Sequence, residues 1–72
     1  MIYRDSRGWT YEVRDGLRNT ETGHTPYKAW SSRPGSGKHK FVNSLPWRDT
    51  REQAEADLKA WAEKKKMELI DE

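Results

Sequence analysis

The sequence predicts an α+β fold, in which a three-stranded antiparallel sheet packs against one C-terminal α-helix. Residues 8–14 alternate between apolar and polar side chains, as in a strand with one buried face. The region after residue 49 instead spaces its apolar side chains three and four positions apart, as in an amphipathic helix. We expect one domain over residues 1–72, divided into a sheet at 1–42, a connector at 43–48, a helix at 49–66 and a tail at 67–72.

The first predicted strand, residues 8–14, is the most regular of the three. Apolar Trp9, Tyr11 and Val13 alternate with a polar threonine, glutamate and arginine. Aromatic and β-branched residues at this spacing are typical of a half-buried strand. We expect residues 2–3 to extend this strand backwards, across a bulge or turn.

The second predicted strand, residues 27–31, follows a polar loop and has two possible facings. If Tyr27 and Ala29 point inward, Trp30 lies outward beside Lys28. If Trp30 is in the core, Lys28 shares its face, which costs free energy unless the lysine reaches an edge. We favour Trp30 pointing outward or lying at the rim of the sheet.

The third predicted strand, residues 40–42, follows a basic loop at 32–39. This loop is rich in glycine, serine and proline, which favour turns and flexible connections. We expect Phe41 to point inward and Lys40 outward. The connector at 43–48 carries a leucine and a tryptophan that we expect to pack beneath the helix.

The helix has the clearest start in the sequence. Asp49 and Thr50 are both good N-cap residues, and each is followed three positions later by Glu or Gln, as in a capping box. One apolar stripe follows, made of Ala54, Leu58, Trp61 and Ala62. Lysines at 64–66 match the helix dipole at the other end. Residues 67–70 either extend the helix or return as an edge strand, and their alternation favours the strand.

The composition sets a low apolar content against many aromatic rings. Apolar residues make up 32% of the chain and charged residues 36%, yet there are four tryptophans, three tyrosines and one phenylalanine. Each ring can bury about 150–250 Å², so a few of them can build a core that a disordered charged chain lacks. The expected core residues are Trp9, Tyr11, Phe41, Leu58 and Trp61.

We expect a cytoplasmic protein. The chain has no cysteine, which suits a reducing compartment and excludes disulfides and thiolate metal sites. It contains no apolar run long enough to span a membrane, and its first residues lack the apolar segment of a signal peptide.

The sequence gives little support for catalysis, and we expect a non-enzymatic protein. His24 and His39 lie in loops, 15 positions apart, with no carboxylate pair placed to complete a metal site. The Gly-Ser-Gly-Lys segment at 35–38 lacks the spacing of a P-loop, although its amides and cations suit phosphate binding. We therefore expect no catalytic residue, no metal, no cofactor and no small-molecule substrate.

Basic charge is concentrated in the predicted sheet. Residues 1–42 carry eight Lys/Arg and four acids, whereas residues 43–72 carry six Lys/Arg and eight acids. Such asymmetry favours contact with a polyanion, and the alternative is chance combined with a solvated helix face. Duplex DNA is the expected partner, and a protein partner is the alternative, because Trp, Tyr and Arg also dominate protein interfaces. We expect an accessory protein that binds DNA through the basic outward face of the sheet and the loop at 33–40. The expected DNA-binding residues are Arg4, Arg7, Arg14, Lys28, Trp30, Arg33, Lys38 and Lys40.

The order of the elements resembles the small AP2-like DNA-binding domains, including the N-terminal arm-binding domains of phage tyrosine recombinases. The likeness is carried by residues 8–14 as first strand, Lys40-Phe41 before the helix, and residues 50–56 as helix start. In that family the helix backs the sheet and sheet residues read DNA. The resemblance therefore implies DNA contacts from Arg14, Lys28 and Lys40.

The small size and high aromatic content are also similar to those of stand-alone accessory proteins of phages and mobile elements. Some of those proteins bind and inhibit host defence or replication proteins. This second resemblance implies an alternative function, in which the chain is an inhibitor or adaptor that targets a host protein complex such as a defence system.

Overall fold

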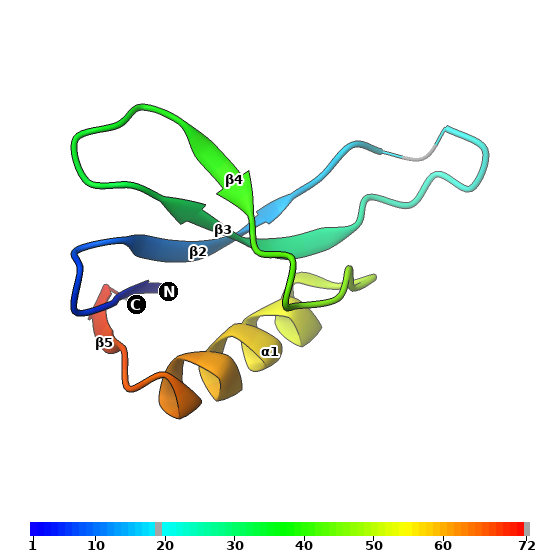
Figure 1. Ribbon diagram of the computed structural model, residues 1–72. Helices are drawn as coiled ribbons and strands as arrows, with labels where there is room; N and C mark the ends of the chain where they lie inside the picture. The colour runs from blue at the N-terminus through cyan, green and yellow to red at the C-terminus, as the bar shows by residue number, and fades with distance from the viewer. Residues whose placement is uncertain (19, 72) are drawn as a thin grey trace.

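The computed structural model describes residues 1–18 and 20–71, which form one antiparallel sheet with a single α-helix packed on it (Figure 1). In chain order the elements are β1 (Ile2–Arg4), β2 (Thr10–Asp15), β3 (Tyr27–Ser32), β4 (His39–Phe41), α1 (Arg51–Lys64) and β5 (Glu68–Asp71). The strands lie in the order β4-β3-β2-β1-β5, and α1 packs mainly against β2 and β3. The predicted α+β fold is confirmed. The expectation that residues 2–3 extend β2 backwards was wrong, because they belong to β1, a separate strand that pairs antiparallel with β2.

One face of the sheet, the covered face, packs against α1. The predicted facing of β2 is confirmed, because Tyr11 and Val13 are buried while the residues between them are not. Ala29 lies opposite Val13 and is also buried, so β3 has the facing that puts Trp30 away from the helix. The full set of buried apolar residues is Tyr3, Tyr11, Val13, Ala29, Val42, Leu45, Ala54, Leu58 and Ala62.

The predicted core was wrong at Phe41. Phe41 lies opposite Trp30, which in turn lies opposite Glu12, and paired residues in an antiparallel sheet share a face. Phe41 is therefore on the face away from α1, and Val42 enters the core instead, its amide donating to the carbonyl of Ala29 at 3.0 Å. Of the other expected core residues, Tyr11 and Leu58 are buried, whereas Trp9 and Trp61 are partly buried against them.

The helix begins as predicted but ends earlier. Thr50 is the N-cap, and its hydroxyl oxygen accepts a hydrogen bond from the amide of Gln53 at 3.2 Å. The helix ends at Lys64, and Lys66 has a φ of 57°, the left-handed conformation that terminates many helices. The amide of Met67 then donates to the carbonyl of Ala62 at 2.8 Å, as in a Schellman motif.

The chain beyond this cap returns as β5, so the expected edge strand near 67–70 is confirmed. β5 pairs antiparallel with β1, so that Ile2 near the start of the chain lies opposite Asp71 (Figure 1). No helix in the described part of the chain is long and apolar enough to cross a membrane.

The connector between β4 and α1 returns to the edge of β3. Tyr27 and Arg48 exchange two backbone hydrogen bonds of 2.7 and 2.9 Å, and Arg48 forms a 3.0 Å ion pair with Asp57 of the helix. Leu45 is buried as expected, but Trp47 is not beneath the helix. Its ring lies over Gly16 on the opposite face of the sheet, the open face.

Candidate functional site

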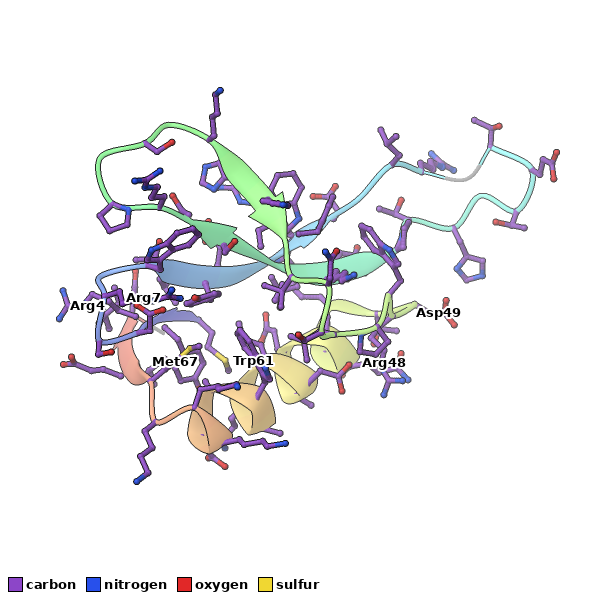
Figure 2. All side chains as sticks on the ribbon, viewed as in Figure 1. Arg4, Arg7, Arg48, Asp49, Trp61 and Met67 are labelled. Carbon is purple, nitrogen blue, oxygen red and sulfur yellow. The ribbon has the colours of Figure 1, made fainter. Side chains whose placement is uncertain are left out.

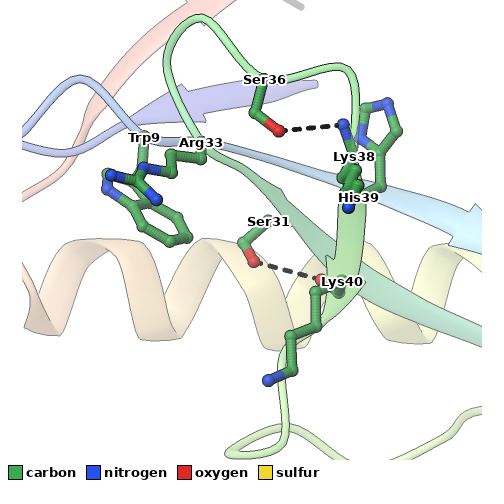
Figure 3. A pocket seen from close by; sticks show the side chains of 7 residues that line it. All are labelled: Trp9, Ser31, Arg33, Ser36, Lys38, His39 and Lys40. Carbon is green, nitrogen blue, oxygen red and sulfur yellow. Dashed lines mark hydrogen bonds between the residues drawn. The ribbon is translucent and has the colours of Figure 1, made fainter.

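A basic concavity lies between the β3–β4 hairpin and the turn that joins β1 to β2 (Figure 3). Its volume is about 370 Å³. It contains no acidic side chain, and its lining residues are Trp9, Ser31, Arg33, Ser36, Lys38, His39 and Lys40. Three of the eight predicted DNA-binding residues, Arg33, Lys38 and Lys40, are thus brought together here.

The hairpin itself positions two of these cations. Lys40 lies opposite Ser31 in the sheet, and the Ser31 hydroxyl donates to the Lys40 carbonyl at 3.1 Å. At the tip, the hydroxyl oxygen of Ser36 accepts a hydrogen bond from the amide of Lys38 at 3.2 Å. Because Ser31 also lies opposite Tyr11, Lys40 belongs to the covered side of the sheet. The prediction that Lys40 points outward was wrong, and the reason is the register of β4.

The β1–β2 turn supplies Trp9 and holds it near the hairpin. Asp5 fixes the turn: its amide donates to the Trp9 carbonyl, and its carboxylate accepts from the Trp9 amide, both at 3.0 Å. Gly8 has a φ of 88°, which strongly favours glycine, and a Cβ built there would lie 3.2 Å from the ring of Pro34. This close approach places the hairpin loop against the turn. The Arg7 guanidinium lies 5.3 Å from the centre of a Trp9 ring.

The Asp5 carboxylate is the centre of the hydrogen bonds in this turn. It accepts from the Tyr11 hydroxyl at 2.9 Å and from the amide of Arg7 at 2.9 Å. Burial raises the pKa of Asp5, but these hydrogen bonds and the one from the Trp9 amide outweigh it, so its pKa is below the usual 3.8. Burial and the Asp5 carboxylate together raise the pKa of the Tyr11 hydroxyl above 10.

Three of the other predicted DNA-binding cations are already paired with acids. Arg4 forms a 3.2 Å ion pair with Glu68 of β5, and Arg7 forms one of 3.3 Å with Asp5. The Arg14 guanidinium donates twice to Glu12, over 2.9 and 3.0 Å. These pairs reduce the positive potential that the three arginines offer to a polyanion. Figure 2 shows Arg4 and Arg7 at the end of the molecule near the chain termini.

Lys28 and Trp30 lie on the open face, as predicted, but neither is freely exposed there. Lys28 is only 7% exposed, with its ammonium nitrogen 5.2 Å from the centre of a Trp47 ring. Trp30 packs edge-to-face on Phe41 with ring centroids 4.1 Å apart, and Phe41 packs in the same way on Trp47 at 4.4 Å. These three rings, Trp30, Phe41 and Trp47, form an open-face aromatic cluster that covers Lys28.

Sequence reasoning missed the role of Trp9 at the concavity. Its alternation with Tyr11 and Val13 correctly put it on the covered face, and that placement suggested a core residue. Trp9 is instead only partly buried, since it packs against the edge of the core and also lines the concavity. Ser31 and Ser36 were also not predicted, because nothing in the sequence distinguishes them from other loop and strand serines.

A second concavity, of about 300 Å³, lies on the other side of the β1–β2 turn, beside Trp61 and Met67. Its main polar groups, on Asp5, Arg7 and Tyr11, are already hydrogen-bonded to one another, so it offers a ligand less than the basic concavity does. Across residues 1–18 and 20–71, no group of three or more His, Asp or Glu side chains is placed to hold a metal ion.

The basic concavity therefore combines three cations, one indole ring, one imidazole and two serine hydroxyls on a shared hairpin and turn. Such a set can neutralise phosphates, stack on a flat ring and donate hydrogen bonds. Comparison of the chain with protein-family models, with curated proteins and with solved structures finds no match to any of them.

Proposed function

We propose that the chain is a non-enzymatic, DNA-binding accessory protein that contacts nucleic acid through the β3–β4 hairpin. The observation that carries this proposal is the convergence of Arg33, Lys38 and Lys40 on a concavity without an acidic residue. Among the described residues, none of these three side chains forms an ion pair, in contrast to Arg4, Arg7 and Arg14. Their charge is therefore available to phosphates.

The proposed surface is narrower than the sheet face that the sequence favoured. Arg14 is held by Glu12, and Lys28 is buried beneath the aromatic cluster, so neither is placed to enter a DNA groove. The basic hairpin loop, which the sequence also favoured, stays part of the proposed surface, and Trp9 lies beside it.

Fluorescence anisotropy with labelled DNA tests this proposal. We expect micromolar or tighter binding at about 50 mM salt, with log K falling with log salt at a slope of about −2 to −3, since about three phosphates are neutralised. The double variant Lys38→Ala/Lys40→Ala should weaken binding and reduce the magnitude of this slope by about 2. Absence of binding at that salt concentration contradicts the proposal.

The matched control is Lys59→Ala/Lys64→Ala, which removes the same charge from exposed positions of α1. We expect this variant to keep at least half of the affinity and the salt slope of the parent. An equal loss in both double variants would mean that net charge, rather than the hairpin, determines binding.

A protein partner is the second candidate, and the observation that favours it is Trp47. Trp47 is 45% exposed and lies on the open face, where no helix packs, and exposed tryptophans often anchor protein interfaces. We propose in this case an inhibitor or adaptor that binds a host protein complex. Capture of one stoichiometric protein from a nuclease-treated bacterial lysate, lost in Trp47→Ser but not in Lys38→Ala/Lys40→Ala, would favour this candidate over DNA.

A further inference from the structure

We infer that the basic concavity holds one unpaired nucleotide of a single strand, with its base against Trp9 and the flanking phosphates on Arg33, Lys38 and Lys40. This inference rests on the proposed function and specifies which form of nucleic acid the site takes. It predicts a preference for single-stranded over duplex DNA, which the sequence did not indicate.

The size and shape of the concavity are the first support. Its volume of about 370 Å³ lies at the lower end of the range for pockets that enclose a small organic molecule. A base within a duplex shows only its edge in a groove, because its faces are stacked on its neighbours. A concavity of this volume that is open to solvent can therefore admit one flat group, such as a base that has left the stack.

The position of Trp9 is the second support. Stacking requires an accessible ring face, and the open-face cluster does not offer one between its members, since Trp30 and Phe41 meet at 62° and Phe41 and Trp47 at 61°. Among the described residues Trp9 packs against no other aromatic ring. The Arg7 guanidinium lies 5.3 Å from the centre of one of its rings, and the indole lines the concavity beside the cations. It is therefore the indole best placed to stack on a base.

The polar groups of the concavity complete the match. Ser36 uses its hydroxyl oxygen as an acceptor for the Lys38 amide, so its own proton can still be donated to a phosphate oxygen. Ser31 donates its proton to the Lys40 carbonyl, so its oxygen can still accept from a base amino or imino group. Figure 3 shows both serines between Trp9 and the segment that carries Lys38, at the end of the hairpin loop, and Lys40 of β4.

Three labelled ligands of equal length, about 12 nucleotides each, test the inference by anisotropy: oligothymidylate, an abasic strand and a duplex. The abasic strand keeps the phosphates and lacks the bases. We expect oligothymidylate to bind about tenfold tighter than the abasic strand, because one stacked base contributes a factor of about 5 to 150. It should also bind tighter than the duplex.

The variant Trp9→Leu should bring oligothymidylate to within about twofold of the abasic strand and leave binding of the abasic strand unchanged. Comparison of the ligands on the parent protein needs no variant, so the inference stays testable even if Trp9→Leu folds poorly. Equal binding of oligothymidylate and the abasic strand, or tighter binding of the duplex, overturns the inference and leaves the proposed function standing.

Two further results separate the remaining cases. Failure of all three ligands to bind at about 50 mM salt removes the proposed function itself. Displacement of oligothymidylate by thymidine 5′-monophosphate at equal concentration would identify a site for a free nucleotide and would overturn the assignment to a strand. We expect thymidine 5′-monophosphate at equal concentration not to displace oligothymidylate, because the mononucleotide offers the three cations one phosphate and the strand offers several.

Discussion

The two faces of the sheet are stabilised in different ways. The covered face packs aliphatic side chains and the buried rings of Tyr3 and Tyr11 against a helix, and Leu58 is fully buried there. The open face has no helix and instead holds Trp30, Phe41 and Trp47 edge-to-face, with the Lys28 ammonium nitrogen over the ring of Trp47. A chain with few aliphatic residues thus protects its second face with large rings.

The cations of the molecule also divide into two groups: some form ion pairs within the fold, and others are free to contact a ligand. Cations near the aromatic cluster and the sheet edge are used within the fold, as Arg14 with Glu12 and Arg4 with Glu68 show. Cations of the β3–β4 hairpin are not used in this way. A lysine or arginine that has an acidic residue two positions away or on the neighbouring strand is therefore a poor candidate for DNA contact. The net charge of residues 1–42 does not show which cations are paired in this way.

Replacement of Leu58 by alanine should have the largest effect, because it removes the centre of the covered face. We expect the free energy of unfolding to fall by about 2–5 kcal/mol, measured by urea denaturation. The neighbouring exposed Lys59→Ala serves as control and should change it by less than about 0.5 kcal/mol. Similar effects of the two substitutions would contradict the packing of α1 on the sheet.

Replacement of Phe41 by alanine measures the open face in the same way. Phe41 is only partly buried, so we expect a loss of about 2 kcal/mol, below the range for a fully buried phenylalanine. Urea denaturation, together with a change in tryptophan emission from Trp30 and Trp47, monitors the result. A loss below about 0.5 kcal/mol would mean that the cluster contributes little to folding, which would strengthen the case for a protein partner.

The variant Asp5→Asn tests the turn that carries Trp9. The pKa of Asp5 is lower in the folded protein, so its charge contributes stability above pH 3.8, and this contribution is lost as pH falls through the folded pKa. We expect the variant to be less stable than the parent by about 1–2 kcal/mol at pH 7, and this difference to shrink in acid. Urea denaturation at neutral and acidic pH measures this difference in the free energy of unfolding. A difference that stays constant with pH would contradict the stabilising role given to the Asp5 carboxylate.

Replacement of Lys66 by glycine should give the smallest effect, with the opposite sign. Lys66 adopts a φ of 57°, which an L-residue with a Cβ populates at a cost of about 1 kcal/mol. We expect glycine to raise the free energy of unfolding by up to about 1 kcal/mol, since the Schellman hydrogen bonds are kept. Lys65→Gly is the control. Lys65 has a φ of −90°, which residues with a Cβ adopt readily, so glycine there should not raise the free energy of unfolding.

Much of the fold could be predicted because the strongest local patterns agree with the structure. The alternation in β2, the capping box at Thr50 and the apolar stripe of α1 each depend on residues close in sequence. The three-residue strands β1 and β4 are too short for a periodic pattern. In β4 a shift of one residue exchanges the faces, and this is why Phe41 and Lys40 were both assigned to the wrong side.

The candidate site was less predictable than the fold. Burial of Lys28 depends on Trp47, which lies in a connector whose path is set by its backbone pairing with Tyr27. The closeness of Trp9 to the hairpin depends on Gly8 meeting Pro34 across two turns. Both contacts join residues that are far apart in the sequence, so neither can be predicted from local composition or spacing.

The pairing of β1 with β5 has a consequence for the order in which the chain folds. The other strand pairs join neighbours in sequence, whereas Arg4 and Glu68 meet across 64 positions. Closing so long a loop costs entropy that hairpins largely avoid, and contacts of this kind form late. We therefore expect the hairpins and α1 to assemble first and the sheet to be completed last, when the C-terminal strand docks beside the N-terminal one.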